Sequence, residues 1–165
     1  MGGQRDGPAL PRLRLWVSSG EPLPPTLATR FFAVLGDGRL LCNLYGSTEV
    51  MGDVTYHVLR SADDLNGLEK VPIGVPLDNC LVYLLDEQMR PAPEGVTAEL
   101  FVAGANVAAG YVAGRDPHRF LRNPLAVDPE YGRLFRTGDF ASLEKGVMRF
   151  EGRTDSQVSR SQKYT

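Results

Sequence analysis

The stretch that decides how this chain is interpreted runs Arg39-Leu40-Leu41-Cys42-Asn43-Leu44-Tyr45-Gly46-Ser47-Thr48-Glu49. Its first four residues are mostly apolar and follow the turn-forming residues 36–38, which predicts a buried strand that ends at a sheet edge. The last seven residues bring together an aromatic ring, a bare backbone turn, a hydroxyl and a carboxylate, and ligands of open α/β sheets bind where strands end. The stretch therefore favours a nucleotide and metal site, although an ordinary strand and turn fits these residues equally well.

The composition is that of a folded domain, with 165 residues of which 42% are hydrophobic. The net charge is -2 and no basic block occurs, so nucleic acid is not expected as a partner. No run approaches the roughly 18 apolar residues of a membrane span, and residues 1–12 form a loose segment without a signal-peptide pattern. Cys42 and Cys80 each lie in an apolar run, which indicates a reduced, cytoplasmic setting.

Residues 13–71 predict a partial α/β subdomain. Leu13 to Val17 alternate between apolar and other side chains, which indicates a strand. The segment from Pro24 to Gly36 predicts a helix, because proline opens it, apolar residues recur at helical spacing and glycine caps its end. Together with a second strand from Arg39 to Leu44, these elements predict a strand-helix-strand crossover in a mainly parallel sheet.

Residues 72–152 predict a β-rich subdomain, a small antiparallel sheet or distorted β-barrel. The candidate strands are Cys80 to Leu85, Glu99 to Ala103, Arg133 to Arg136, Phe140 to Leu143 and Val147 to Phe150. The turn at residues 144–146 makes the last two a hairpin. One short helix is expected at Pro117 to Leu121, where Asp116 precedes a proline. The fold class is therefore α/β followed by antiparallel β, and residues 153–165 form a hinge and tail.

Three further segments supply groups that the first stretch lacks. Glu99 to Gly104 leads into Gly110-Tyr111, Phe135 to Asp139 places a carboxylate after a strand, and Glu151 to Val158 adds an arginine and another carboxylate. In this order and spacing, the segments resemble the adenylate-forming, or AMP-binding, superfamily, which includes nonribosomal peptide synthetase adenylation domains and acyl-CoA synthetases. The resemblance covers nearly all of residues 13–158 and implies the last part of such an enzyme's large region. It implies a ligase that joins a carboxylic or amino acid to AMP from MgATP.

The resemblance also implies roles in holding the nucleotide. Backbone around Gly20 and Glu21 would line the adenine pocket, where Asn43 would meet the adenine amino edge and Tyr45 would stack on the ring. Gly46 would allow the nucleotide to approach closely. Asp139 would bind the ribose hydroxyls, and Arg153, with Phe150 packed beside it, would reach the ribose or phosphate. Thr48 would bond the α-phosphate and Glu49 would ligate Mg²⁺, which prefers oxygen ligands. Tyr111 is interpreted as core packing rather than as a ligand contact.

Asp155 corresponds to the hinge of the family, where it would act by backbone rotation between two closed forms. Taken outside the ordered motifs, Asp139 is read as a turn cap, and Arg153 with Asp155 as a surface pair. The ordered context favours the binding roles.

In the amino-acid-activating branch, the acyl pocket would be walled by Val17, Ser19, Leu44, Gly52 and Asp53. A partly desolvated carboxylate needs a cation, which a substrate ammonium would supply. The α-amino-acid enzymes carry their aspartate in an earlier motif, so Asp53 indicates an amine that reaches deeper, as in a β-amino acid.

The resemblance is closest to the Ebony-type β-alanyl-bioamine synthetases. It is carried by the segments Trp16 to Pro22, Gly46 to Tyr56 and Asn123 to Val127. This implies β-alanine as the acyl substrate and transfer of the acyl group to an amine or to the phosphopantetheine of a carrier domain outside the chain.

The sequence departs from the family at several points. Ala98 stands where the family has glycine, and after Val158 the chain does not continue into a Lys-Ile-Arg-Gly type sequence. Lys163 does not match the catalytic lysine, and no Gly/Ser/Thr-rich phosphate loop precedes Leu13. We therefore expect no adenylation by this chain without the missing parts of its domain. The alternatives are a noncatalytic nucleotide-binding or protein-interaction module and a nonfunctional partial product.

Overall fold

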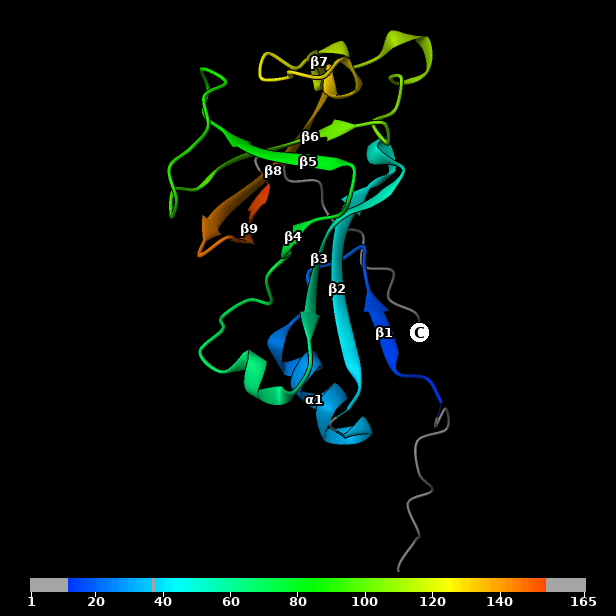
Figure 1. Cartoon of the computed structure of the whole chain (residues 1–165), viewed down its shortest axis with the longest axis vertical. Helices are drawn as coiled ribbons and strands as arrows, with labels where there is room; N and C mark the ends of the chain where they lie inside the picture. Colours follow the sequence, from blue (N-terminus) through cyan, green and yellow to red (C-terminus); the bar gives the residue numbers. More distant parts are fainter. Residues whose placement is uncertain (1–11, 37, 154–165) are drawn as a thin grey trace, which may run out of the picture.

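The computed structural model describes residues 12–36 and 38–153. Figure 1 shows an elongated arrangement, with a four-stranded sheet and its helix at one end and a five-stranded sheet at the other. Among the described residues, no helix is both long and apolar enough to cross a membrane. The predicted hinge residue Asp155 lies outside the described residues.

The first sheet is built on the predicted crossover. Strand β1 (Leu15–Ser18) is followed by helix α1 (Pro25–Leu35) and by β2 (Leu40–Ser47), which pairs with β1 in parallel. Strands β3 (Gly52–Leu59) and β4 (Val75–Pro76) extend the sheet by antiparallel pairing. The expected strand-helix-strand crossover of an α/β arrangement is confirmed. The sheet is mixed rather than mainly parallel, because the chain reverses directly after β2 and both later pairings are antiparallel.

Helix α1 forms where the proline and glycine signals place it. Pro24 precedes it, and at its other end Gly36 adopts a φ of 77° and donates its N–H to the carbonyl of Phe32. Ala28 and Phe32 are buried against the first sheet in a cluster that includes Leu41. Burial of this one face fixes the helix on the sheet.

The second sheet is antiparallel throughout. Its strands are β5 (Cys80–Leu85), β6 (Ala98–Gly104), β7 (Phe120–Arg122), β8 (Arg133–Glu144) and β9 (Val147–Arg153). Their order is β5-β6-β8-β7, and β9 also pairs with β8. The two strands predicted at 133–136 and 140–143 are one long strand, whose first part pairs with β7 and whose second part pairs with β9. The expected antiparallel β-rich second half is confirmed.

The short helix predicted at Pro117 to Leu121 begins at Pro117 as expected, but it ends earlier than predicted. The structure has a single 3₁₀ turn at Pro117–Arg119, and Phe120 begins strand β7. Pairing of Phe120 with Phe135 in β8 outweighs the local helix signal, because the pairing adds ladder hydrogen bonds and packs the two rings together.

One hydrophobic cluster joins the two sheets. Val54 from β3 and Ile73 from the following linker pack with Leu100, Phe135 and Met148 from the second sheet. The side chains of Val54 and Leu100 are fully buried. Residues far apart in the chain are thereby held close enough to build a site between the sheets.

Candidate functional site

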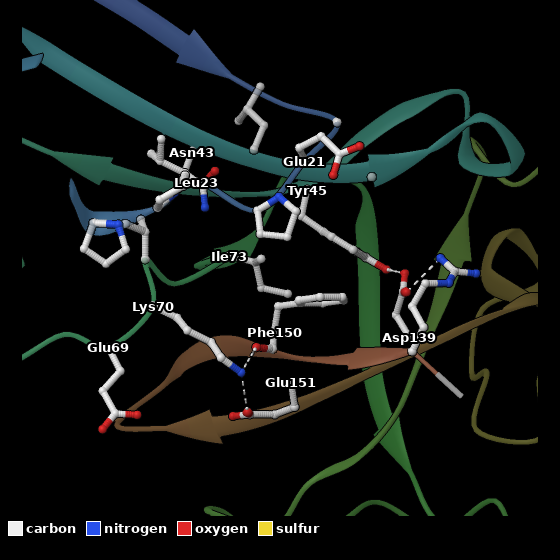
Figure 2. Close-up of a pocket in the computed structure, with 18 residues that line it drawn as sticks. Glu21, Leu23, Asn43, Tyr45, Glu69, Lys70, Ile73, Asp139, Phe150 and Glu151 are labelled. Atoms are coloured by element: carbon white, nitrogen blue, oxygen red, sulfur yellow. Dashed lines mark hydrogen bonds and ion pairs between the residues drawn. The ribbon is translucent and has the colours of Figure 1, made fainter. Parts of the chain in front are cut away.

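A pocket of about 740 Å³ lies between the two sheets, as Figure 2 shows. This volume is within the range of about 300–1,000 Å³ that is common for small-molecule sites. Nine of the residues predicted for the site line it: Gly20, Glu21, Asn43, Leu44, Tyr45, Gly46, Asp139, Phe150 and Arg153. The structure therefore brings together segments that are more than a hundred residues apart in sequence.

Asn43 of β2 holds one wall of the pocket in place. Its buried side-chain amide donates a hydrogen bond from Nδ2 to the carbonyl of Pro72 at 2.8 Å. The buried Thr55 of β3 donates in the same way to the carbonyl of Ile73 at 2.7 Å. These two bonds fasten the linker that precedes β4 across the sheet, so that Ile73 becomes part of the pocket wall.

One end of the pocket holds a polar cluster around Asp139. The Tyr45 hydroxyl donates to Asp139 Oδ2 at 2.5 Å, and Arg153 Nη1 lies 2.8 Å from Oδ1. Arg153 Nη2 also donates to the carbonyl of Thr137 at 3.1 Å. In Figure 2 the Tyr45 side chain points at Asp139, with Phe150 below it. Burial, and then the charge of Asp139, raise the pKa of Tyr45 well above its usual value.

The pairing of β8 with β9 explains why this cluster forms. Ala141 lies opposite Phe150, whereas Phe140 lies opposite Gly152, so Glu151 is an extra residue in β9. Asp139 consequently lies opposite Arg153, and the carboxylate meets the guanidinium across the two strands.

Gly46 lies where β2 and β3 approach closely. A Cβ at this position would lie 1.9 Å from the carbonyl oxygen of Gly52 and 2.5 Å from Asp53 Cα. The register also shifts between Tyr45 and Gly46. The backbone of β3 therefore passes so close to Gly46 that any larger residue at this position would force the two strands apart.

Thr48 and Glu49 lie outside the pocket lining, in a 3₁₀ turn (Thr48–Val50) directly after β2. Glu49 Oε1 accepts a hydrogen bond of 2.6 Å from the Tyr111 hydroxyl. Burial opposes ionisation of Glu49, but the Tyr111 bond, further local donors and the charge of Arg119 hold its pKa below the usual value. Burial, and then the Glu49 contact, raise the pKa of Tyr111 to about 12.

Four of the residues predicted for an acyl pocket do not line the main pocket: Val17, Ser19, Gly52 and Asp53. Ser19 Oγ donates to Asp53 Oδ1 at 2.5 Å, which joins the turn after β1 to β3. Val17 is 57% exposed, so no acyl pocket wall covers it in the described part of the chain. Only Leu44 of the predicted set borders the main pocket.

Two charged groups near the site are not predicted from the sequence, Lys70 and Arg119. Lys70 lines the pocket and places Nζ 3.2 Å from Glu151 Oε2 and 3.3 Å from the Phe150 carbonyl. Arg119 donates to the carbonyl of Thr137 at 3.1 Å, as Arg153 does. No local pattern relates Lys70 to Glu151, because 81 residues separate them.

The donors near Glu49 fit a shared magnesium ion rather than a protein-only metal site. Within residues 12–36 and 38–153, no group of three or more His, Cys, Asp or Glu side chains is arranged to hold a metal. Glu49 offers a carboxylate and Thr48 a hydroxyl, both of them oxygen ligands. Mg²⁺ is commonly bound by one or two carboxylates together with substrate phosphates, so the residues present fit that ion.

The family model described as "AMP-binding enzyme" matches residues 2–112. The chain therefore belongs to the family of AMP-binding enzymes, as its sequence resemblance implies.

Curated relatives include long peptide synthetases. The chain is 54% identical over 158 residues to the beta-alanyl-bioamine nonribosomal peptide synthetase ebony of Drosophila melanogaster, covering 95% of this chain and 18% of that protein. It is 41% identical over 149 residues to the phosphinothricin tripeptide synthetase PhsB of Streptomyces viridochromogenes, covering 88% of this chain and 12% of that protein. The chain thus spans only a small part of the length of either relative.

Solved structures with similar folds also contain adenylation domains. PA1221, described as a nonribosomal peptide synthetase protein containing adenylation and PCP domains, matches with a TM-score of 0.77 and 33% identity, covering 90% of this chain and 30% of that one. The NpsA N-terminal subdomain of Klebsiella oxytoca, in complex with 3-hydroxybenzoyl-AMSN, matches with a TM-score of 0.74 and 28% identity, covering 84% and 35%. The chain thus corresponds to part of an adenylation domain.

Proposed function

We propose that this chain supplies the adenine, ribose and Mg²⁺ contacts of an adenylation domain that activates an amino acid or other carboxylic acid with MgATP. The observation that carries the proposal is the pocket end formed by Tyr45, Asp139 and Arg153, where a buried carboxylate lies beside an aromatic ring. A carboxylate with two acceptor oxygens suits the vicinal hydroxyls of a ribose. An aromatic ring suits a flat base.

Each group then has a defined task. Adenine would stack on Tyr45, and its amino group would donate to the side-chain carbonyl of Asn43, whose NH₂ already binds Pro72. The ribose hydroxyls would bind Asp139, so the Tyr45 hydroxyl must share or release that carboxylate when a nucleotide enters. Thr48 would contact the α-phosphate and Glu49 would hold the metal, which neutralises phosphate charge when bound.

We propose β-alanine as the acyl group, because the ebony relative is named for a β-alanyl product and because Asp53 offers a carboxylate to an ammonium. When residues 13–153 replace their counterpart in a complete relative, Asp53→Ala should lower activation of β-alanine about tenfold more than that of α-alanine. Pyrophosphate exchange measures both. An unchanged preference would reject the β-alanine assignment. A carrier domain with phosphopantetheine is the proposed acceptor outside this chain.

Nucleotide binding is tested by calorimetry with AMP, and with ATP plus Mg²⁺. Asp139→Asn should weaken AMP binding by roughly tenfold to a hundredfold, since charge-assisted hydrogen bonds to the ribose are lost. Asp86→Asn is the matched control, because Asp86 pairs with Arg90 on the surface, away from the pocket. An unaltered chain that binds no AMP would contradict the proposal.

We expect binding without turnover from the chain alone, because its 165 residues include neither the phosphate loop nor the matching lysine. Those groups stabilise charge in the transition state. Pyrophosphate exchange by the purified chain would reject this expectation while leaving the nucleotide pocket in place.

A further inference from the structure

We propose that Tyr111 is a positioning residue for Glu49, which fixes the carboxylate of Glu49 so that one of its oxygens stays directed to a magnesium-bound nucleotide. This inference rests on the proposed function and extends it to a residue that the sequence interpretation assigned to core packing. Tyr111 lies 62 residues beyond Glu49, and its hydroxyl donates to Glu49 Oε1 at 2.6 Å.

The loop after β6 is bonded to the turn that carries Glu49 at three points. Asn106 Nδ2 donates to the carbonyl of Val50 at 3.1 Å, and the N–H of Ala108 donates to the carbonyl of Glu49 at 2.8 Å. The Tyr111 hydroxyl makes the third bond, to the Glu49 side chain. Both the backbone and the carboxylate of Glu49 are therefore held by this one loop.

The loop can approach the turn because of Gly104. A Cβ there would lie 2.7 Å from Asn106 Oδ1 and 2.7 Å from the carbonyl oxygen of Asn79, and Gly104 has a φ of 145° that side chains rarely adopt. Glycine at this position thus leaves room for the Asn106 side chain, which reaches the carbonyl of Val50.

The ring of Tyr111 is fixed from the opposite side by the core. It packs edge-on against Phe120 with ring centroids 5.2 Å apart and an angle of 78°. Phe120 packs in turn against Phe135, also at 5.2 Å, and Phe135 is only 2% exposed. The position of the half-buried Tyr111 ring is consequently set by an aromatic contact that leads through Phe120 to the buried Phe135.

The chemical value of the contact lies in the two oxygens of a carboxylate. A hydroxyl on Oε1 leaves Oε2 for a metal and reduces the rotamers that must be frozen when the ion binds. Partners that hold a metal ligand in this way typically contribute about tenfold to a hundredfold in metal affinity. Arg119 lies close enough for its positive charge to favour the ionised form of Glu49.

The test uses Tyr111→Phe in the full 165-residue chain, which removes the hydroxyl and keeps the ring. ATP affinity is measured by calorimetry in EDTA and in Mg²⁺, and the ratio gives the gain due to the metal. We expect Tyr111→Phe to lower this gain about tenfold while ATP affinity in EDTA stays within about twofold. Tyr83→Phe is the control, because that hydroxyl accepts from Asn123 and does not contact Glu49.

A second readout reports the position of the Glu49 side chain directly. In the nucleotide-free chain, the two γ protons of Glu49 should have separate NMR shifts, which merge in Tyr111→Phe as the side chain begins to rotate. A loss of ATP affinity that is equal in EDTA and in Mg²⁺ would show a merely structural role and overturn the inference, as would an unchanged metal gain. A chain that binds ATP with no gain from Mg²⁺ overturns the inference alone. No ATP binding at all overturns the proposed function together with it.

Discussion

The Tyr45 hydroxyl is held in its protonated form by its surroundings. An unfolded tyrosine ionises near pH 10, whereas burial and then the charge of Asp139 raise the pKa of Tyr45 in the folded chain. Folding therefore favours the protonated phenol. Its contribution to stability is complete below about pH 10 and is lost as the pH rises above that value.

We accordingly expect the chain to lose stability relative to Tyr45→Phe as the pH rises from about 9 to about 11, because phenylalanine has no proton to lose. Denaturant unfolding of both proteins at each pH measures the difference in free energy of unfolding. A difference that stays constant across this range would show that Tyr45 ionises as readily when folded as when unfolded.

Several pocket residues were predictable singly, because their motifs fall at recognisable spacings. Asn43, Tyr45, Asp139 and Arg153 were each expected at a nucleotide site, and all four line one pocket. Their contacts with one another were not predictable. The bond from Tyr45 to Asp139 joins residues 94 apart, and only the packing of two sheets brings them into contact.

At the scale of elements, strand β6 is the centre of the second sheet, and all seven of its residues are buried. Leu100 is fully buried there, so Leu100→Ala should lower the free energy of unfolding by about 2–5 kcal/mol. Leu81→Ala in the neighbouring β5 is the control and should cost about 1 kcal/mol or less, because Leu81 is already 38% exposed. Denaturant unfolding compares the two. Equal losses would contradict this account of the core.

The elements with strong local signals were predicted correctly, as helix α1 shows with its proline start and glycine end. Strand β3 was not predicted, because Val54 and Thr55 are neighbours on opposite faces and both are fully buried. A buried threonine breaks the alternation of polar and apolar residues, and it is tolerated only through its bond to Ile73. The extra residue in β9 likewise has no sequence signal, although it sets Asp139 opposite Arg153.

At the scale of the whole molecule, one edge of the first sheet is apolar and exposed. Strand β1 is the outer strand of that sheet in the described part of the chain, with Leu15 49% and Val17 57% exposed. Exposed apolar edge strands pair with other chains, and a lysine at the edge opposes such pairing.

We therefore expect the chain to self-associate as its concentration rises, and Val17→Lys to weaken this association about tenfold. Sedimentation velocity over a concentration series measures the effect. Val127→Lys provides the control, because Val127 is fully exposed outside the strands. A chain that is monomeric at every concentration would contradict the expectation.

Backbone NMR with added AMP shows whether the space between the two sheets is an adenine nucleotide pocket. Saturable shift changes should concentrate at Asn43, Tyr45, Asp139, Phe150 and Arg153, which share that pocket. Strand β5, which lies outside the pocket lining, should show little change. A nucleotide pocket between the sheets would be contradicted if AMP caused no saturable change, or if the changes clustered on β5 and left the pocket residues unaffected.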